Sequence, residues 1–207
     1  MYQWAQDLWP FNRSLTGQGV LDTFVYLQHF LPGLKVHSIK TGEQVFDWVI
    51  PQQWHCDSAY IITPNGKKIC DFSLCNLHLV GYSEPVNRTM SLRELRPHLH
   101  SLPNQPGLIP YVTSYYRRYW GFCLSHNQLE QLPEGDYQVV INSQLFDGVL
   151  NYADCLIKGE SEKEILLSTN VCHPSLANNE LSGPVMVTAL GQWLKQQAKH
   201  HFSYRLV

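Results

Sequence analysis

The stretch EILLSTNVCHPSLANNELSGP, residues 164–184, decides the fold, because it reads as a strand, a polar loop and the start of a helix. Ile165 to Leu167, with Val171, gives the short apolar run typical of a buried central strand in a parallel sheet. From Ser182 onward, apolar residues recur at helical spacing. The loop therefore opens at the carboxyl end of a strand, where open α/β sheets bind their ligands.

This loop resembles the first metal-binding loop of the co-catalytic zinc aminopeptidases, in which a strand ends in a histidine ligand and a G-A-x-D-N-x-S-G stretch precedes a helix. Residues 9–17 (WPFNRSLTG), 109–116 (IPYVTSYY) and 120–126 (WGFCLSH) resemble a subgroup of bacterial aminopeptidase-like proteins. The resemblance covers nearly the whole chain. It implies an α/β fold with a zinc-aminopeptidase-like three-layer sheet, incomplete here, and an inserted, mostly β small domain.

The resemblance implies a metal site in which His173 is the first ligand. The metal-bridging aspartate falls at Asn179, a neutral and weaker oxygen donor, with Glu180 beside it. Two neighbouring zinc ions repel strongly, and a bridging carboxylate offsets part of that charge. A substitute role for Glu180, a site for one ion, and a chain without metal are alternatives that the sequence leaves open. The candidate ligands are His173, Asn179 and Glu180, and the implied cofactor is zinc, as one or two ions.

The last segment, Phe202 to Val207, alternates like the beginning of another strand. In the aminopeptidases that the chain resembles, the catalytic glutamate, a further carboxylate ligand and the last histidine ligand follow this point. The resemblance thus implies that the general base lies beyond residue 207 and that the chain is an N-terminal fragment. A co-catalytic site needs about five protein ligands and a base, so we expect no hydrolysis by this chain alone.

Length and composition predict a globular chain: it has 207 residues, of which 44% are hydrophobic. A net charge of −2 provides no electrostatic footprint for nucleic acid or an anionic membrane. The sequence has no secretory signal and no apolar run of transmembrane length, and its six cysteines form no CxxC pair. We therefore expect a cytoplasmic protein with reduced thiols. A homo-oligomer is left open.

The chain's organisation predicts one domain interrupted by another. An apolar stripe between Val20 and Leu31 predicts a helix, capped by Ser14 or Thr16, and residues 34–39 predict a strand. We expect this strand to share a sheet with residues 165–167. The α/β domain then comprises residues 1–46 and 152–207, and residues 47–151 form the inserted, mostly β domain.

The inserted region is predicted from its short β-like runs and turns. The runs are at residues 60–62, 68–70, 77–81, 121–124 and 137–141, with turns at 64–66 and 133–135. Residues 91–99 predict one short helix, with Ser91 as its N-cap and Glu94 at the capping-box position.

Three residues are candidates for substrate binding. Arg13 belongs to the opening segment that the resemblance picks out, and can hold a substrate carboxylate, neutralise a charged ligand shell, cap the first helix region or pair with Asp7. Tyr115 belongs to an aromatic and basic run, residues 111–120, that fits either sugar or peptide stacking or simple packing. His126 can reach the metal loop if the insertion folds over it, or is an ordinary surface histidine.

Two functions from different classes are consistent with these patterns. The first is a zinc-dependent, aminopeptidase-like hydrolase acting on a peptide or another amide bond. The second is a non-catalytic small-molecule-binding or scaffold module that keeps the fold without metal, as Asn179 suggests. Metal content distinguishes the two, whereas the identity of the substrate does not follow from the sequence.

Overall fold

The computed structural model describes residues 1–207, which divide into two compact units. Unit 1 consists of Met1–Gln53 and Asp147–Val207, and unit 2 consists of Trp54–Phe146. Unit 2 is thus inserted into the sequence of unit 1, and its ends fall inside the range 47–151. Each unit has its own four-stranded sheet.

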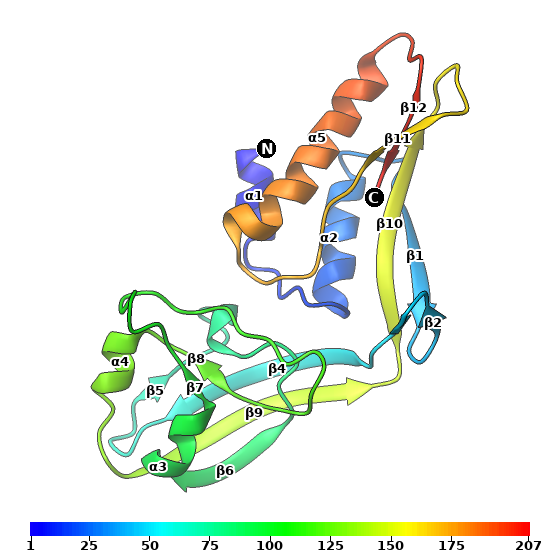
Figure 1. Ribbon diagram of the computed structural model, residues 1–207. Coiled ribbons are helices and arrows are strands. Elements are labelled where there is room, and N and C mark those ends of the chain that lie inside the picture. The colour runs from blue at the N-terminus through cyan, green and yellow to red at the C-terminus, as the bar shows by residue number, and fades with distance from the viewer. The chain divides into compact units, whose positions relative to one another are not determined.

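Unit 1 is a mixed α/β unit (Figure 1). Its helices are α1 (Tyr2–Leu8), α2 (Gln18–Gln28), the π-helical turn η3 (Ala177–Leu181) and α5 (Ser182–Gln196). Its strands are β1 (Lys35–Lys40), β2 (Gln44–Val45), β3 (Trp48–Val49), β10 (Val149–Ile157), β11 (Glu164–Leu167) and β12 (Ser203–Leu206). None of the chain's helices combines the length and the apolar composition that crossing a membrane requires.

The sheet of unit 1 has the strand order β1-β10-β12-β11. β11 and β12 pair in parallel, and the other two pairs are antiparallel. β1 and β11 belong to one sheet although all of unit 2 lies between them in the sequence, which confirms that prediction. The strand predicted at the end of the chain is β12, and it lies between β10 and β11.

The central position predicted for the strand at 165–167 is wrong. β11 is the last strand of the sheet and has β12 as its only neighbour, although the pairing is parallel as expected. Leu166 is consequently 61% exposed. An apolar run indicates a strand, but the run alone does not say whether one or two neighbours flank it.

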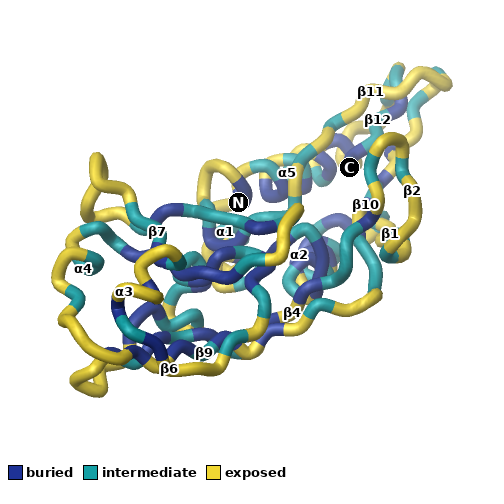
Figure 2. Tube along the Cα trace, turned by 60° about the horizontal axis from the view of Figure 1, so that its bottom comes forward, coloured by how far each residue is buried: buried dark blue, intermediate teal, exposed yellow.

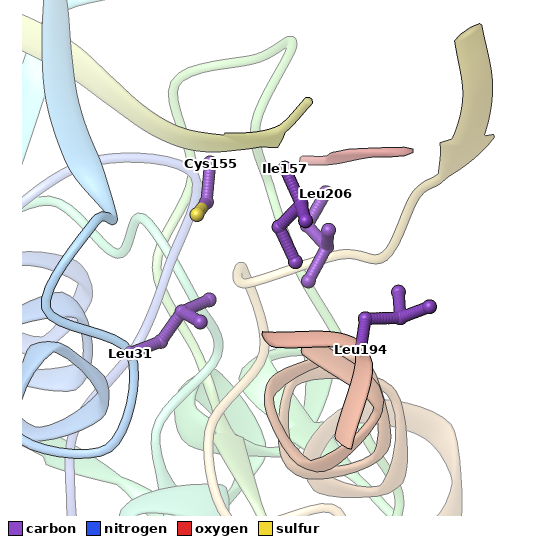
Figure 3. Packing of buried hydrophobic residues seen from close by; sticks show 5 residues of the cluster. All are labelled: Leu31, Cys155, Ile157, Leu194 and Leu206. Carbon is purple, nitrogen blue, oxygen red and sulfur yellow. The ribbon is translucent and has the colours of Figure 1, made fainter. Parts of the chain in front are cut away.

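The core of unit 1 lies between one face of the sheet and the helices α2 and α5, which share that side (Figure 1). Figure 3 shows five side chains of this core, all at most 8% exposed: Leu31, Cys155, Ile157, Leu194 and Leu206. Leu31 lies three residues beyond the end of α2, and the others come from β10, β12 and α5. The β2–β3 hairpin, by contrast, is mostly exposed (Figure 2).

A close approach between α2 and the opening segment shapes that segment. A Cβ at Gly19 would lie 2.1 Å from the carbonyl oxygen of Asn12, so only glycine fits there. The N-cap of α2 is Gly17 with φ +102°, and no side chain caps the helix. The predicted cap by Ser14 or Thr16 is therefore wrong, because the Ser14 hydroxyl instead donates to the carbonyl of Thr16 at 2.6 Å. The predicted apolar stripe is buried at Val20, Phe24 and Leu27.

Unit 2 contains a four-stranded sheet with the order β5-β4-β9-β6 and a parallel β7-β8 pair. The strands are β4 (Gln53–Ile62), β5 (Lys68–Ile69), β6 (Val86–Ser91), β7 (Leu99–His100), β8 (Phe122–Cys123) and β9 (Asp136–Phe146). The helices are η1 (Asn76–His78), α3 (Leu92–Leu95), η2 (Arg96–His98) and α4 (His126–Glu130).

Two local predictions for unit 2 have opposite outcomes. The capping box at the start of α3 is confirmed, since the Ser91 hydroxyl accepts from the Glu94 N–H while the Glu94 carboxylate accepts from the Ser91 N–H. The strand predicted at residues 77–81 is wrong, because η1 occupies its beginning and the rest makes only isolated bridges, from Leu79 to Phe122 and from Gly81 to Thr113. The His78 Nδ1 lies 2.7 Å from the carbonyl oxygen of Cys123.

Candidate metal centre

The loop after β11 leaves the sheet at its carboxyl end and is anchored at two points. Near its beginning, the backbone N–H of Thr169 donates to the carbonyl of Val207 at 2.9 Å and so continues the parallel pairing with β12. Near its end, Ser175 adopts φ +35° and its hydroxyl donates to the carbonyl of Trp9 at 2.9 Å. These anchors hold the segment that contains Cys172 and His173 against the opening segment of the chain.

The loop ends in η3, whose defining bond runs from the Leu181 N–H to the carbonyl of Leu176 at 3.1 Å. Such single π-helical turns are frequent at functional sites, because the wider turn redirects neighbouring side chains. Here Glu180 is buried at 1% exposure, whereas the preceding Asn179 is exposed. Of the two candidate oxygen ligands, the structure therefore brings only Glu180 to His173.

Three potential metal ligands form what we call the donor cluster: Cys172, His173 and Glu180. Their ligand atoms all lie within 4.8 Å of one another. The Cys172 Sγ is 2.9 Å from the His173 Nδ1, and that nitrogen is 3.0 Å from the Glu180 Oε2. The second oxygen, Oε1, accepts the backbone N–H of Cys172 at 2.5 Å. The carboxylate of Glu180 thus fixes both the loop backbone and the histidine ring.

Arg13 lies behind the donor cluster and is only 1% exposed. Its Nε donates to the carbonyl of His173 at 3.0 Å, and its Nη1 donates to the carbonyl of Leu8 at 2.7 Å. The Nε is also 3.8 Å from the Glu180 Oε1, whereas the buried Nη2 has no hydrogen-bond partner. Burial lowers the pKa of Arg13 to about 10, and the charge of Glu180 opposes this shift.

Sequence reasoning did not identify Cys172 as a candidate metal ligand. The structure places this thiol in the donor cluster instead. Burial, with the charge of Glu180, raises the pKa of Cys172 to about 12, so the thiol is protonated when no ion is bound. Adjacency to His173 was the available signal, but consecutive side chains of an extended chain normally point in opposite directions.

The three predicted substrate-binding residues have separate surroundings. Arg13 is the buried guanidinium behind the donor cluster. Tyr115 and His126 belong to unit 2: the Tyr115 hydroxyl is 2.8 Å from that of Tyr111, and the His126 Nδ1 is 3.0 Å from the Ser101 hydroxyl. A substrate-binding role for the three stays a prediction.

Part of the aromatic and basic run of unit 2 forms a packed aromatic cluster, which comprises His98, His100, Tyr119 and Trp120. The His98 ring stacks on the Trp120 ring with 3.6 Å between centroids and 7° between planes. The His100 Nε2 is 2.9 Å from the Tyr119 hydroxyl. This supports packing as the role of the cluster, whereas Tyr116, earlier in the run, is 83% exposed.

The donor cluster fits one zinc ion in its chemistry. Thiolate sulfur, imidazole nitrogen and carboxylate oxygen are the ligand types that zinc accepts in proteins. The His173 side chain is 22% exposed and Cys172 is partly exposed, whereas the Glu180 side chain is fully buried, so an ion can enter from the side of Cys172 and His173. Asn179 is outside the cluster, and its role as a ligand stays a prediction.

Comparison with known proteins matches residues 2–207 to the family described as "Domain of unknown function (DUF4910)". A relative from Clostridium acetobutylicum is 44% identical over all 207 residues, and its name connects it with polysaccharide biosynthesis and an aminopeptidase-like domain. The chain spans 47% of that relative's length.

Two solved structures share the fold. The first is the crystal structure of a Clostridium acetobutylicum protein that is described as a peptidase. It is 44% identical and superposes with a TM-score of 0.96, over 99% of this chain and 48% of that protein's chain. The zinc aminopeptidase BSAP of Bacillus subtilis is 10% identical, with a TM-score of 0.58 over 99% of this chain and 58% of its own. The second likeness concerns the fold alone.

Proposed function

Because the chain belongs to the family described as "Domain of unknown function (DUF4910)" and has the fold of zinc aminopeptidases, we propose that it carries the metal-binding loop of an aminopeptidase-like metallohydrolase. The substrate class is a peptide or another amide. His173 and Glu180 are the proposed zinc ligands. The C. acetobutylicum relative, whose name includes an aminopeptidase-like domain, supports the assignment to this class.

One observation carries the proposal: the His173 Nδ1 and the Glu180 Oε2 lie 3.0 Å apart in the loop that follows a parallel strand. Open α/β sheets bind their ligands at this edge. Chance proximity of a histidine and a carboxylate is common on surfaces, but here the carboxylate is fully buried and the loop backbone donates to it. A buried carboxylate is costly unless it has a partner.

The residues of the chain have distinct proposed roles around the ion. Zinc, when bound, polarises a substrate carbonyl and lowers the pKa of a bound water. Glu180 holds the histidine ring through Oε2 and the loop backbone through Oε1. Arg13 fixes the carbonyl of His173 and so the orientation of the loop. We expect the 207-residue chain alone to show no measurable aminopeptidase turnover, because loss of a general base typically costs about 10²- to 10⁴-fold.

A specific observation favours a second candidate function, that of a metal-free binding or scaffold module. Arg13 and Glu180 form a buried pair with 3.8 Å between Nε and Oε1, which balances the charge of the carboxylate without an ion. The guanidinium and the carboxylate then cancel each other's charge.

Equilibrium dialysis against zinc, with metal content measured afterwards, distinguishes the two functions. We expect the chain to retain zinc, and His173→Ala to lose that zinc while keeping the wild-type circular dichroism spectrum. His29→Ala is a matched control, because His29 is an exposed histidine of unit 1 whose ring only bonds carbonyls of its own helix. A folded chain that retains no zinc would establish the second candidate instead.

A further inference from the structure

We propose that Cys172 is a direct metal ligand, so that this chain holds a single zinc-type ion through one sulfur, one nitrogen and one oxygen atom, from Cys172, His173 and Glu180. This inference rests on the proposed function and deepens it. A co-catalytic site for two ions bridged by a carboxylate is the arrangement that it replaces. The observations that carry it are the positions of the three ligand atoms, the contacts that hold them, and the charge of Arg13.

The three atoms already surround a common point. Zinc bound at about 2.3 Å to sulfur and about 2.0 Å to nitrogen or oxygen separates tetrahedral ligands by roughly 3.3 to 3.6 Å. The present separations are 2.9 Å between the Cys172 Sγ and the His173 Nδ1, and 3.0 Å between that nitrogen and the Glu180 Oε2. Each of these two contacts therefore has to open by only about half an ångström, and the Cys172 Sγ and the Glu180 Oε2 lie within 4.8 Å of each other.

The backbone around the donor cluster is fixed by contacts that do not use the ligand atoms themselves. The Glu180 Oε1 accepts the N–H of Cys172 at 2.5 Å, which leaves Oε2 for an ion. The guanidinium of Arg13 holds the carbonyl of His173 at 3.0 Å. Ligands that are held by such supporting bonds bind metal more tightly, because less conformational freedom is lost on binding.

Among the residues of this chain, charge favours a single ion at the donor cluster. A thiolate at Cys172 and the carboxylate of Glu180 together neutralise one divalent cation, and the buried Arg13 adds a positive charge 3.8 Å from the carboxylate. A second divalent ion would add further repulsion, and the cluster offers no further carboxylate to offset it.

The sulfur ligand also determines which metals the site accepts. Thiolates favour zinc and other borderline or soft ions over magnesium and calcium, which prefer oxygen. Formation of the metal–sulfur bond releases the thiol proton of Cys172 to solvent, so binding of one ion liberates one proton at this residue.

Cobalt(II), which replaces zinc in such sites, reports the sulfur directly. We expect the 207-residue chain to bind Co²⁺ with a near-ultraviolet sulfur-to-cobalt charge-transfer band that Cys172→Ser abolishes, together with a loss of affinity of at least about a hundredfold. Cys75→Ser is the matched control, because Cys75 is a half-buried free thiol in unit 2, and it should leave the band unchanged. X-ray absorption at the zinc edge of the wild-type chain should show one sulfur neighbour at about 2.3 Å and needs no folded variant.

The outcomes separate this inference from the proposed function. Binding of Co²⁺ that depends on His173 but shows no charge-transfer band, or a zinc shell without sulfur, overturns the role of Cys172 and leaves the proposed function intact. A band that persists in Cys172→Ser overturns it as well, because the sulfur then comes from another thiol. A folded chain that binds neither metal overturns both.

Discussion

The donor cluster of unit 1 and the aromatic cluster of unit 2 both contain partly buried histidines, but the rings have different hydrogen-bond partners. In the aromatic cluster, His98 stacks on Trp120 and its Nδ1 lies 2.8 Å from the Trp120 carbonyl oxygen. His100 lies against the neutral hydroxyl of Tyr119. In the donor cluster, His173 instead meets a thiol and a buried carboxylate.

This difference separates histidines that stabilise a fold from those that bind something. Rings that face carbonyls and neutral hydroxyls have their hydrogen bonds satisfied by the chain itself. A buried guanidinium and carboxylate beside a thiol are costly to bury, and such costs concentrate at functional sites. The comparison therefore predicts that changes in the donor cluster alter metal binding, whereas changes in the aromatic cluster alter stability and leave metal binding unchanged.

The largest expected effect is that of Arg13→Met. Removal of one partner of a buried ion pair leaves the other charge uncompensated and costs about 3–5 kcal/mol, and here the carbonyls of Leu8 and His173 also lose their donor. Urea unfolding followed by circular dichroism measures this. Arg117→Met is the control in unit 2: its guanidinium is exposed and lies 4.6 Å from the Tyr119 ring centre, which predicts a loss of about 0.5–1 kcal/mol. Equal losses for both variants would contradict the comparison.

Two substitutions with effects of intermediate size test the same comparison. His98→Gln removes the stack on Trp120 and should cost about 1–2 kcal/mol of unfolding free energy, with zinc affinity unchanged. His173→Gln should lower zinc affinity by at least about a hundredfold and change the unfolding free energy by about 1 kcal/mol or less. Zinc titration and urea unfolding of both variants are the measurements. A loss of zinc affinity in His98→Gln would break the distinction.

The smallest expected effect is on pH dependence in the aromatic cluster. Burial, followed by the charges of Arg117 and His98, lowers the pKa of His100 below its ordinary value of 6.5. As pH falls below about 6.5, the unfolded chain takes up this proton before the folded chain does, so stability decreases. His100→Gln should therefore lose less stability than wild type between about pH 7.5 and about pH 5.5.

Urea midpoints at the two pH values measure this difference. His55→Gln serves as control, because its imidazole is exposed and lies 2.9 Å from the exposed carboxylate of Asp57. Identical pH dependence of wild type and His100→Gln would show that burial of His100 has no influence on stability.

The parts of the fold that follow from neighbouring residues could be predicted from the sequence. The stripe of α2, the capping box of Ser91 and Glu94, and the strand β12 depend on spacings of two to four residues, which periodicity reveals. The turn η1 could not be predicted, because it depends on which segments lie beside it in space.

The candidate site was predicted in part for the same reason. His173 was identified through the resemblance to the zinc aminopeptidases, and Glu180 as the neighbour of Asn179, on which the bridging aspartate falls. The burial of Arg13 was not predicted, because its partner carbonyl at His173 is 160 positions away in the sequence. The approach of the Cys172 thiol to the His173 ring depends on a local backbone bend that residue types do not reveal.

The π-helical turn η3 changes which of two neighbouring residues, 179 or 180, faces His173. In the alignment with the aminopeptidase pattern, the acidic residue falls at position 179. In the structure, the carboxylate that contacts His173 is that of residue 180. A widened turn of this kind brings a carboxylate at 180, rather than at 179, to His173. We therefore expect chains with the acidic residue at either position to form the same site. A search for the sequence motif alone would miss chains that carry it at position 180.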